Sequence, residues 1–128
     1  MSIRSFQDLV VEAKKGIREI SPEDLYSKMS SSEKMVIIDV READSHREGR
    51  VFGAVNIPRG SLEMEIGDRV RSPDRMIVVH CGGGGRSALA ARTLQKMGYK
   101  NIYSLAGGFK LWKDKGFPVS PADDARRK

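Results

Sequence analysis

The sequence has little cysteine, few aromatic residues and no long apolar run. Cys81 is the single cysteine among 128 residues, so no disulfide can form within the chain and no zinc site of clustered cysteines exists. No apolar run approaches the roughly 20 residues that span a bilayer. The first twenty residues interleave charged with apolar side chains, which argues against a secretory signal. We therefore expect a cytoplasmic protein, in a reducing compartment where a lone thiol persists.

The scarcity of aromatic residues also bears on the net charge of +6. Only four Phe, three Tyr and one Trp are available for stacking on bases. Between residues 76 and 120, seven Lys and Arg residues stand against Asp114 alone, and they are dispersed rather than clustered. We therefore expect neither a nucleic-acid partner nor a membrane. The basic excess nevertheless falls in the half of the chain that contains Cys81.

Apolar periodicity and capping residues predict four helices. Apolar residues spaced three and four apart predict a helix over residues 6–16, and Ser21 followed by proline predicts the start of a second helix that runs to about Met29. Two further helices are expected over residues 86–97 and 109–115, each closed by a glycine.

Three short segments, residues 35–38, 76–79 and 101–105, have the apolar character of strands buried on both faces. They alternate with helices, which predicts an α/β fold with a mainly parallel central sheet flanked by helices on both faces. Asp39 and Cys81 follow the first two strands. Functional groups of parallel sheets collect at this edge, beyond the carboxyl ends of the strands.

The most specific feature is the run Cys81-Gly82-Gly83-Gly84-Gly85-Arg86-Ser87, between a predicted strand and a helix. Glycines let backbone N–H groups turn toward one point, and the following helix adds the positive end of its dipole. A cysteine beside such a cradle has a lowered pKa and reacts as the thiolate. The alternative is an inert buried cysteine with a flexible glycine linker. The glycines, the fixed charge of Arg86 and the strand-to-helix context favour the reactive cysteine.

Four separated motifs follow one another along the chain. The motifs are Ile38-Asp39-Val40-Arg41, Gly53-Ala54-Val55-Asn56-Ile57-Pro58, the loop from Cys81 to Ser87 in the form C-x-x-G-x-R-S, and Leu105-Ala106-Gly107-Gly108 followed by Trp112. Together they resemble the rhodanese-like family of sulfurtransferases over about residues 17–118, and the resemblance implies a rhodanese-like fold. It divides the chain into an N-terminal helical extension (1–16), whose role is open, a rhodanese-like domain (17–120) and a flexible tail (121–128).

The resemblance also implies roles for individual residues. Cys81 is the expected persulfide-forming nucleophile, and Arg86 is the expected cation that stabilises the loop and faces an anion. Asp39 and Arg41 are expected to support the site. The substrate-binding cradle is formed by the backbone N–H groups of Gly82, Gly83, Gly84, Gly85 and Ser87. No metal and no cofactor are implied.

The implied activity is transfer of a sulfane sulfur from thiosulfate or a related small anionic donor to cyanide or a thiol, with a thioredoxin-like protein among the acceptor candidates. One alternative is a carrier or interaction module that hands sulfur to a protein without turnover of small molecules. Another is a phosphatase or arsenate reductase of the same fold. The latter have seven residues from Cys to Arg, whereas Cys81 to Arg86 counts six, as in sulfurtransferases.

The remaining polar residues are given simpler roles. His80 points away from its neighbour Cys81 on a strand, so we expect a packed core histidine, while His46 is expected to be exposed in a charged segment. Asp39 is expected to pair with an arginine rather than act as a base. Where the family often has Gly-His-Ile, this chain has Gly49-Arg50-Val51. A cation there, or at Arg59, could steer an anionic donor or simply be solvated.

Overall fold

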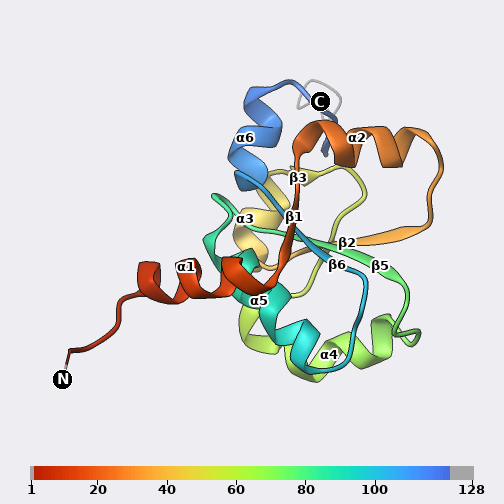
Figure 1. The fold of residues 1–128 in the computed structure, drawn as a ribbon. Coiled ribbons are helices and arrows are strands. Elements are labelled where there is room, and N and C mark those ends of the chain that lie inside the picture. Colours follow the sequence, from red (N-terminus) through yellow and green to blue (C-terminus); the bar gives the residue numbers. More distant parts are fainter. Residues whose placement is uncertain (1, 122–128) are drawn as a thin grey trace.

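The computed structural model describes residues 2–121 and is built around a five-stranded parallel sheet (Figure 1). The strands lie in the order β1 (Arg18–Ile20), β6 (Ile102–Leu105), β5 (Met76–His80), β2 (Met35–Asp39) and β4 (Val55–Asn56). A separate antiparallel sheet pairs β3 (Arg50–Val51) with β7 (Val119–Ser120). The predicted α/β fold with a mainly parallel sheet is confirmed.

Helices connect these strands. They are α1 (Phe6–Gly16), α2 (Pro22–Ser30), α3 (Ala43–Glu48), the 3-10 helix η1 (Arg59–Ser61), α4 (Leu62–Arg69), α5 (Gly85–Lys96) and α6 (Gly108–Asp114). The four predicted helices are α1, α2, α5 and α6, and their bounds differ from the prediction by at most one residue. As expected, Ser21 caps α2, because its hydroxyl accepts a hydrogen bond from the backbone N–H of Asp24 at 3.0 Å.

Helices cover both faces of the parallel sheet, because side chains of its central strands alternate between two cores. Ile38 and Val79 belong to the core that α4 and α5 cover, whereas Ile37 and Val78 belong to the core that α2 and α6 cover. Figure 1 shows α4 and α5 below the sheet and α2 and α6 above it. Burial on both faces explains why these strands are apolar throughout.

The sequence did not predict β1, β7 or any element between residues 40 and 75. Most of these elements have two to six residues, which is too short for a period of 2 or 3.6 to stand out. The helix α4 has eight residues but buries only Leu62 and Ile66, so its apolar pattern is weak as well. The tail predicted to be flexible lies outside the described residues apart from Pro121.

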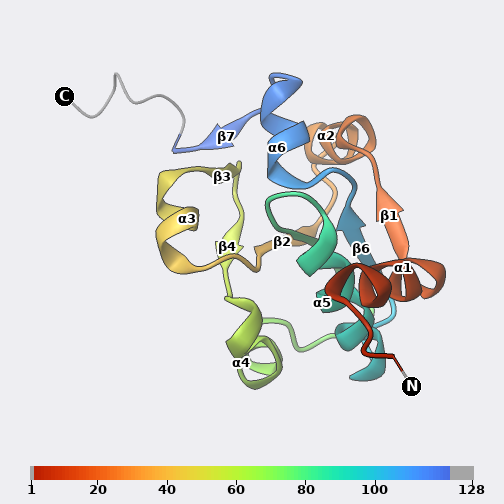
Figure 2. The same cartoon turned by 90° about the vertical axis from the view of Figure 1, so that its left-hand side faces the viewer.

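The N-terminal helix α1 packs across α5 (Figure 2). Val10 and Ala13 are buried against Ala88 of α5. A capping box holds the start of α1: Ser5 and Asp8 exchange side-chain to backbone hydrogen bonds of 2.9 and 3.0 Å. The helix is therefore capped at its start and packed on α5 through its buried face. No helix within residues 2–121 is long and apolar enough to cross a membrane.

Candidate active site

The loop after β5 curls around the sulfur of Cys81. The cysteine is 1% exposed, and its Sγ accepts hydrogen bonds from the backbone N–H groups of Gly84 at 3.1 Å and Ser87 at 3.4 Å. Gly84 is the N-cap of α5 and has φ of +102°, a left-handed conformation that suits glycine. This turn directs the N–H groups of Gly84 and Ser87 at the sulfur, whereas those of Gly82 and Gly85, which the sequence also assigns to the cradle, make no hydrogen bond to it.

The surroundings of the thiol favour its ionised form. Burial raises the pKa of Cys81, but hydrogen bonds from the Ser87 hydroxyl and from the N–H groups of Ser87, Gly84 and Gly83 outweigh burial and lower it below the ordinary value. The Ser87 hydroxyl lies 3.5 Å from Cys81 Sγ and 2.8 Å from the hydroxyl of Ser104. Ser104 is buried on β6 and was not predicted. Its O–H can donate to Ser87, which leaves the Ser87 proton for the thiolate.

We expect Ser87→Ala to raise the pKa of Cys81, because the thiolate loses a donor while burial is unchanged. A hydrogen bond to a charged group contributes about 1.5 kcal/mol, so the midpoint of the pH profile for alkylation of the thiol by iodoacetamide should rise by about one pH unit. The measurement is the alkylation rate against pH. Ser104→Ala, which removes a hydroxyl without touching the sulfur, should shift the profile less. Equal profiles for wild type and Ser87→Ala would rule out the hydroxyl as a thiolate donor.

A hollow of about 310 Å³ opens beside Cys81. The loop contributes Gly83, Gly85 and Arg86, and α1 contributes the other lining residues. Arg86 is exposed and makes no ion pair with any residue that the structure describes. Its guanidinium therefore supplies an uncompensated positive charge at the opening.

A second glycine turn, Gly107-Gly108 at the start of α6, contacts the backbone of the cysteine loop. The N–H groups of Phe109 and Lys110, in the first turn of α6, donate to the carbonyls of Cys81 at 2.8 Å and Gly82 at 3.0 Å. Gly108 has φ of +63°, and a methyl group on it would stand 2.5 Å from the carbonyl oxygen of Gly82. The motif ending in Gly107-Gly108 thus lets α6 approach the backbone of the cysteine loop.

Asp39 lies at the centre of a buried ionic cluster at the end of β2. Its carboxylate accepts bonds of 2.9 Å from Arg41 Nε and Nη2, and His46 Nδ1 lies 2.9 Å away. Burial raises the pKa of Asp39, but the hydrogen bonds from Arg41, the field of His80 and the contact with His46 together lower it. The predicted ion pair with Arg41 is confirmed. The exposed position predicted for His46 is wrong, because α3 turns its ring inward onto the carboxylate.

The motif from Gly53 to Pro58 places an amide beside this cluster. Asn56 Nδ2 donates to the carbonyls of Asp39 at 2.9 Å and Arg41 at 3.0 Å. Arg41 also lies over the ring of Phe109, 4.9 Å from its centroid. A chain of contacts therefore links the Asp-x-Arg element to α6, and α6 to the cysteine loop.

His80 is a core residue, as predicted. It is fully buried, and desolvation lowers its pKa to about 4 although Asp39 opposes the shift. Nδ1 lies 3.3 Å from the Cys81 carbonyl, and Nε2 has no partner among residues 2–121. The ring is neutral near pH 7 and faces the core shared with Phe109, not the sulfur.

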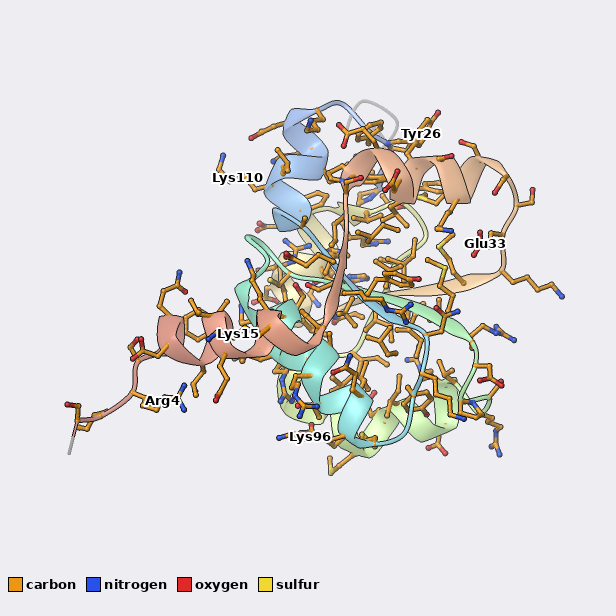
Figure 3. All side chains as sticks on the ribbon, in the orientation of Figure 1. Arg4, Lys15, Tyr26, Glu33, Lys96 and Lys110 are labelled. Atoms are coloured by element: carbon orange, nitrogen blue, oxygen red, sulfur yellow. The ribbon has the colours of Figure 1, made fainter. Side chains whose placement is uncertain are left out.

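The other predicted cations lie away from the sulfur. Arg59 bonds to Glu63 and Thr93, and Arg50 donates to the His46 carbonyl; neither lines the hollow at Cys81. Figure 3 labels Lys110 beside α6 and Lys96 near the end of α5, also outside that lining. Most of the basic excess is therefore surface charge. No group of three His, Cys, Asp or Glu within the described residues could hold a metal ion.

The fold and this loop define an α/β protein with a single cysteine held in a backbone N–H cradle. A sequence profile described as the rhodanese-like domain matches residues 21–115. The chain belongs to the rhodanese-like domain family.

Three known proteins illustrate its relatives. The chain is 35% identical over 104 residues to "Thiosulfate sulfurtransferase GlpE" of Actinobacillus succinogenes, covering 81% of this chain and 91% of that protein. It is 34% identical over 99 residues to YrkF of Bacillus subtilis, whose name proposes a sulfur carrier protein; 77% of this chain matches only 52% of YrkF. A solved structure from Rhodopseudomonas palustris, described as of unknown function and a possible tyrosine phosphatase, has a TM-score of 0.82 and 33% identity, covering 94% and 98% of the two chains.

Proposed function

We propose that this chain is a sulfurtransferase that carries a sulfane sulfur as a persulfide on Cys81. The observation that carries the proposal is the cradle of N–H donors 3.1 and 3.4 Å from the sulfur of the single cysteine. The same donors that lower the thiol pKa would stabilise negative charge on a persulfide. The relative named thiosulfate sulfurtransferase, from Actinobacillus succinogenes, supports this activity.

In the first half-reaction the Cys81 thiolate attacks the outer sulfur of thiosulfate. A bond forms between Cys81 Sγ and that sulfur, the S–S bond of the donor breaks, and sulfite leaves with the electron pair. The donors that lower the pKa of Cys81 increase the share of thiolate relative to an ordinary cysteine, and the proposed step uses no general base. Arg86 attracts the anionic donor. Asp39 and Arg41 support the loop indirectly, through Phe109.

In the second half-reaction an acceptor removes the sulfur. Cyanide or a thiolate attacks the outer sulfur of the persulfide, thiocyanate or a new persulfide leaves, and the Cys81 thiolate returns. The sequence has no second cysteine that could displace the sulfur within the chain. A thiol of another molecule, such as a thioredoxin-like protein, is the acceptor that we propose alongside cyanide.

The test is to mix the protein with thiosulfate and to measure its intact mass by mass spectrometry. We expect a one-sulfur adduct that cyanide removes, with thiocyanate formed in equal amount, and no adduct on Cys81→Ser. Steady turnover with cyanide supports an enzyme. An adduct that forms but passes only to a protein thiol supports the carrier module instead.

Two results would overturn the proposal. One is a wild-type protein that takes up no sulfur from thiosulfate or from a thiosulfonate. The other is Cys81-dependent hydrolysis of a phosphate ester without sulfur uptake, which would favour the phosphatase alternative raised by the Rhodopseudomonas structure. The six-residue cradle, with its N–H groups already directed at one sulfur atom, argues against that outcome.

A further inference from the structure

The N-terminal helix α1 forms one wall of the hollow beside Cys81. Four α1 residues line it, Phe6, Gln7, Val10 and Lys14, opposite the cysteine loop. Three of them are spaced four apart, which places them on one face of the helix. The matched family profile begins at residue 21, so this wall comes from outside the matched segment.

The wall is held close to the loop. A methyl group on Gly85 would stand 2.9 Å from Cζ of Phe6 and 3.5 Å from Val10, so both side chains lie directly against the backbone of the glycine run. Val10 is 3% exposed. The position of α1 therefore decides the shape of the opening through which a donor reaches the sulfur.

The charge of this opening is positive on both sides. Lys14 and Arg86 line the hollow, and no acidic residue does. The carboxylate of Glu19 lies 3.7 Å from Lys14 Nζ, and both side chains are partly exposed. Such a pair is weak in water, so the ammonium can turn to an anion in the hollow. Two cations facing one opening suit an anion of charge −2 better than one of charge −1.

We propose that Lys14 is a donor-specificity residue, which together with Arg86 selects dianionic sulfur donors for Cys81. The inference rests on the proposed sulfurtransferase function. Lys14 acts on donor capture, and an acceptor of charge −1, such as cyanide, should depend on it less than thiosulfate does. Thiosulfate carries the required charge, and its sulfonate end is the part that the two cations would hold.

The experiment compares Lys14→Gln with Lys15→Gln. The two substitutions remove the same charge from adjacent residues, but Lys15, labelled on α1 in Figure 3, lines other hollows and not the one at Cys81. The measurement is the second-order rate of persulfide formation, by rapid quenching and intact mass, with thiosulfate and with the monoanion methanethiosulfonate. We expect Lys14→Gln to slow the thiosulfate reaction about three- to tenfold. Methanethiosulfonate has half the charge of thiosulfate, so its electrostatic attraction to Lys14 is about half as large. The factor by which Lys14→Gln slows this donor should therefore be roughly the square root of the factor for thiosulfate.

A third variant moves the rate in the opposite direction. Glu19→Gln removes the carboxylate that competes for Lys14, so it should speed the thiosulfate step without disturbing the fold. The proposal is overturned if Lys14→Gln and Lys15→Gln react alike, or if Lys14→Gln slows both donors equally. If the wild type itself forms no persulfide with either donor, the proposed function fails rather than the assignment of Lys14.

Discussion

Substituting Gly108 by alanine should both destabilise the fold and impair persulfide formation. Its backbone is left-handed, with φ of +63°, and the added methyl group would stand 2.5 Å from the Gly82 carbonyl oxygen and 2.8 Å from that of Cys81. Backbone atoms cannot yield as a flexible side chain can, so α6 must move away from the cysteine loop. We expect a loss of about 3 kcal/mol in the free energy of unfolding, by urea titration.

Gly116→Ala is the matched control, because it lies just beyond the same helix. Gly116 also has a positive φ, +81°, but nothing lies within 4 Å of an added methyl group. It should lose only about 1 kcal/mol, the cost of the left-handed conformation, and form persulfide at the wild-type rate. Equal losses at both positions would show that the approach of α6 to the loop has no energetic importance.

The parts of the fold that the sequence could predict are those with a strong local signal. The strands β2 and β5 are continuous apolar runs because both faces of the sheet are covered. The cysteine loop is recognisable by its four consecutive glycines. Two of them are required by the structure: Gly84 has φ of +102°, and a methyl group on Gly85 would stand 2.9 Å from Phe6. Position at the ends of neighbouring strands then brings Asp39 and Cys81 to one edge, where Asp39 and His80 are register partners.

The parts that were missed depend on contacts between distant segments. His46 lies in a six-residue helix, and nothing in its charged neighbourhood indicates that its ring turns toward Asp39. In the sequence, Ser104 has the features of an ordinary strand residue. The pairing of β5 with β6 brings its hydroxyl to that of Ser87. Lys14 looks like a solvated lysine at the end of an amphipathic helix. Its place beside the cysteine loop follows from how α1 crosses α5, which no local pattern encodes.

Asp39→Asn should be among the most destabilising isosteric changes in the chain. The carboxylate is fully buried and accepts three bonds from Arg41, one of them from its backbone N–H at 3.0 Å. Asparagine keeps the shape but removes the charge, and leaves the buried guanidinium without its counter-ion. Breaking a buried pair in this way costs about 3–5 kcal/mol. Urea unfolding at pH 7 measures the loss.

The pH dependence separates a lost ion pair from a mere packing defect. The pKa of Asp39 is lowered in the folded chain from its ordinary value of 3.8. The contribution of its charge is therefore complete above pH 3.8 and is lost as pH falls through the folded value. The difference in the free energy of unfolding between the wild type and Asp39→Asn should then become smaller in acid. Asp44→Asn, at an exposed pair with Arg47, should change stability by less than about 0.5 kcal/mol at any pH. If this difference between the wild type and Asp39→Asn stays constant down to strongly acidic pH, the cluster depends on the shape of the Asp39 side chain and not on its charge.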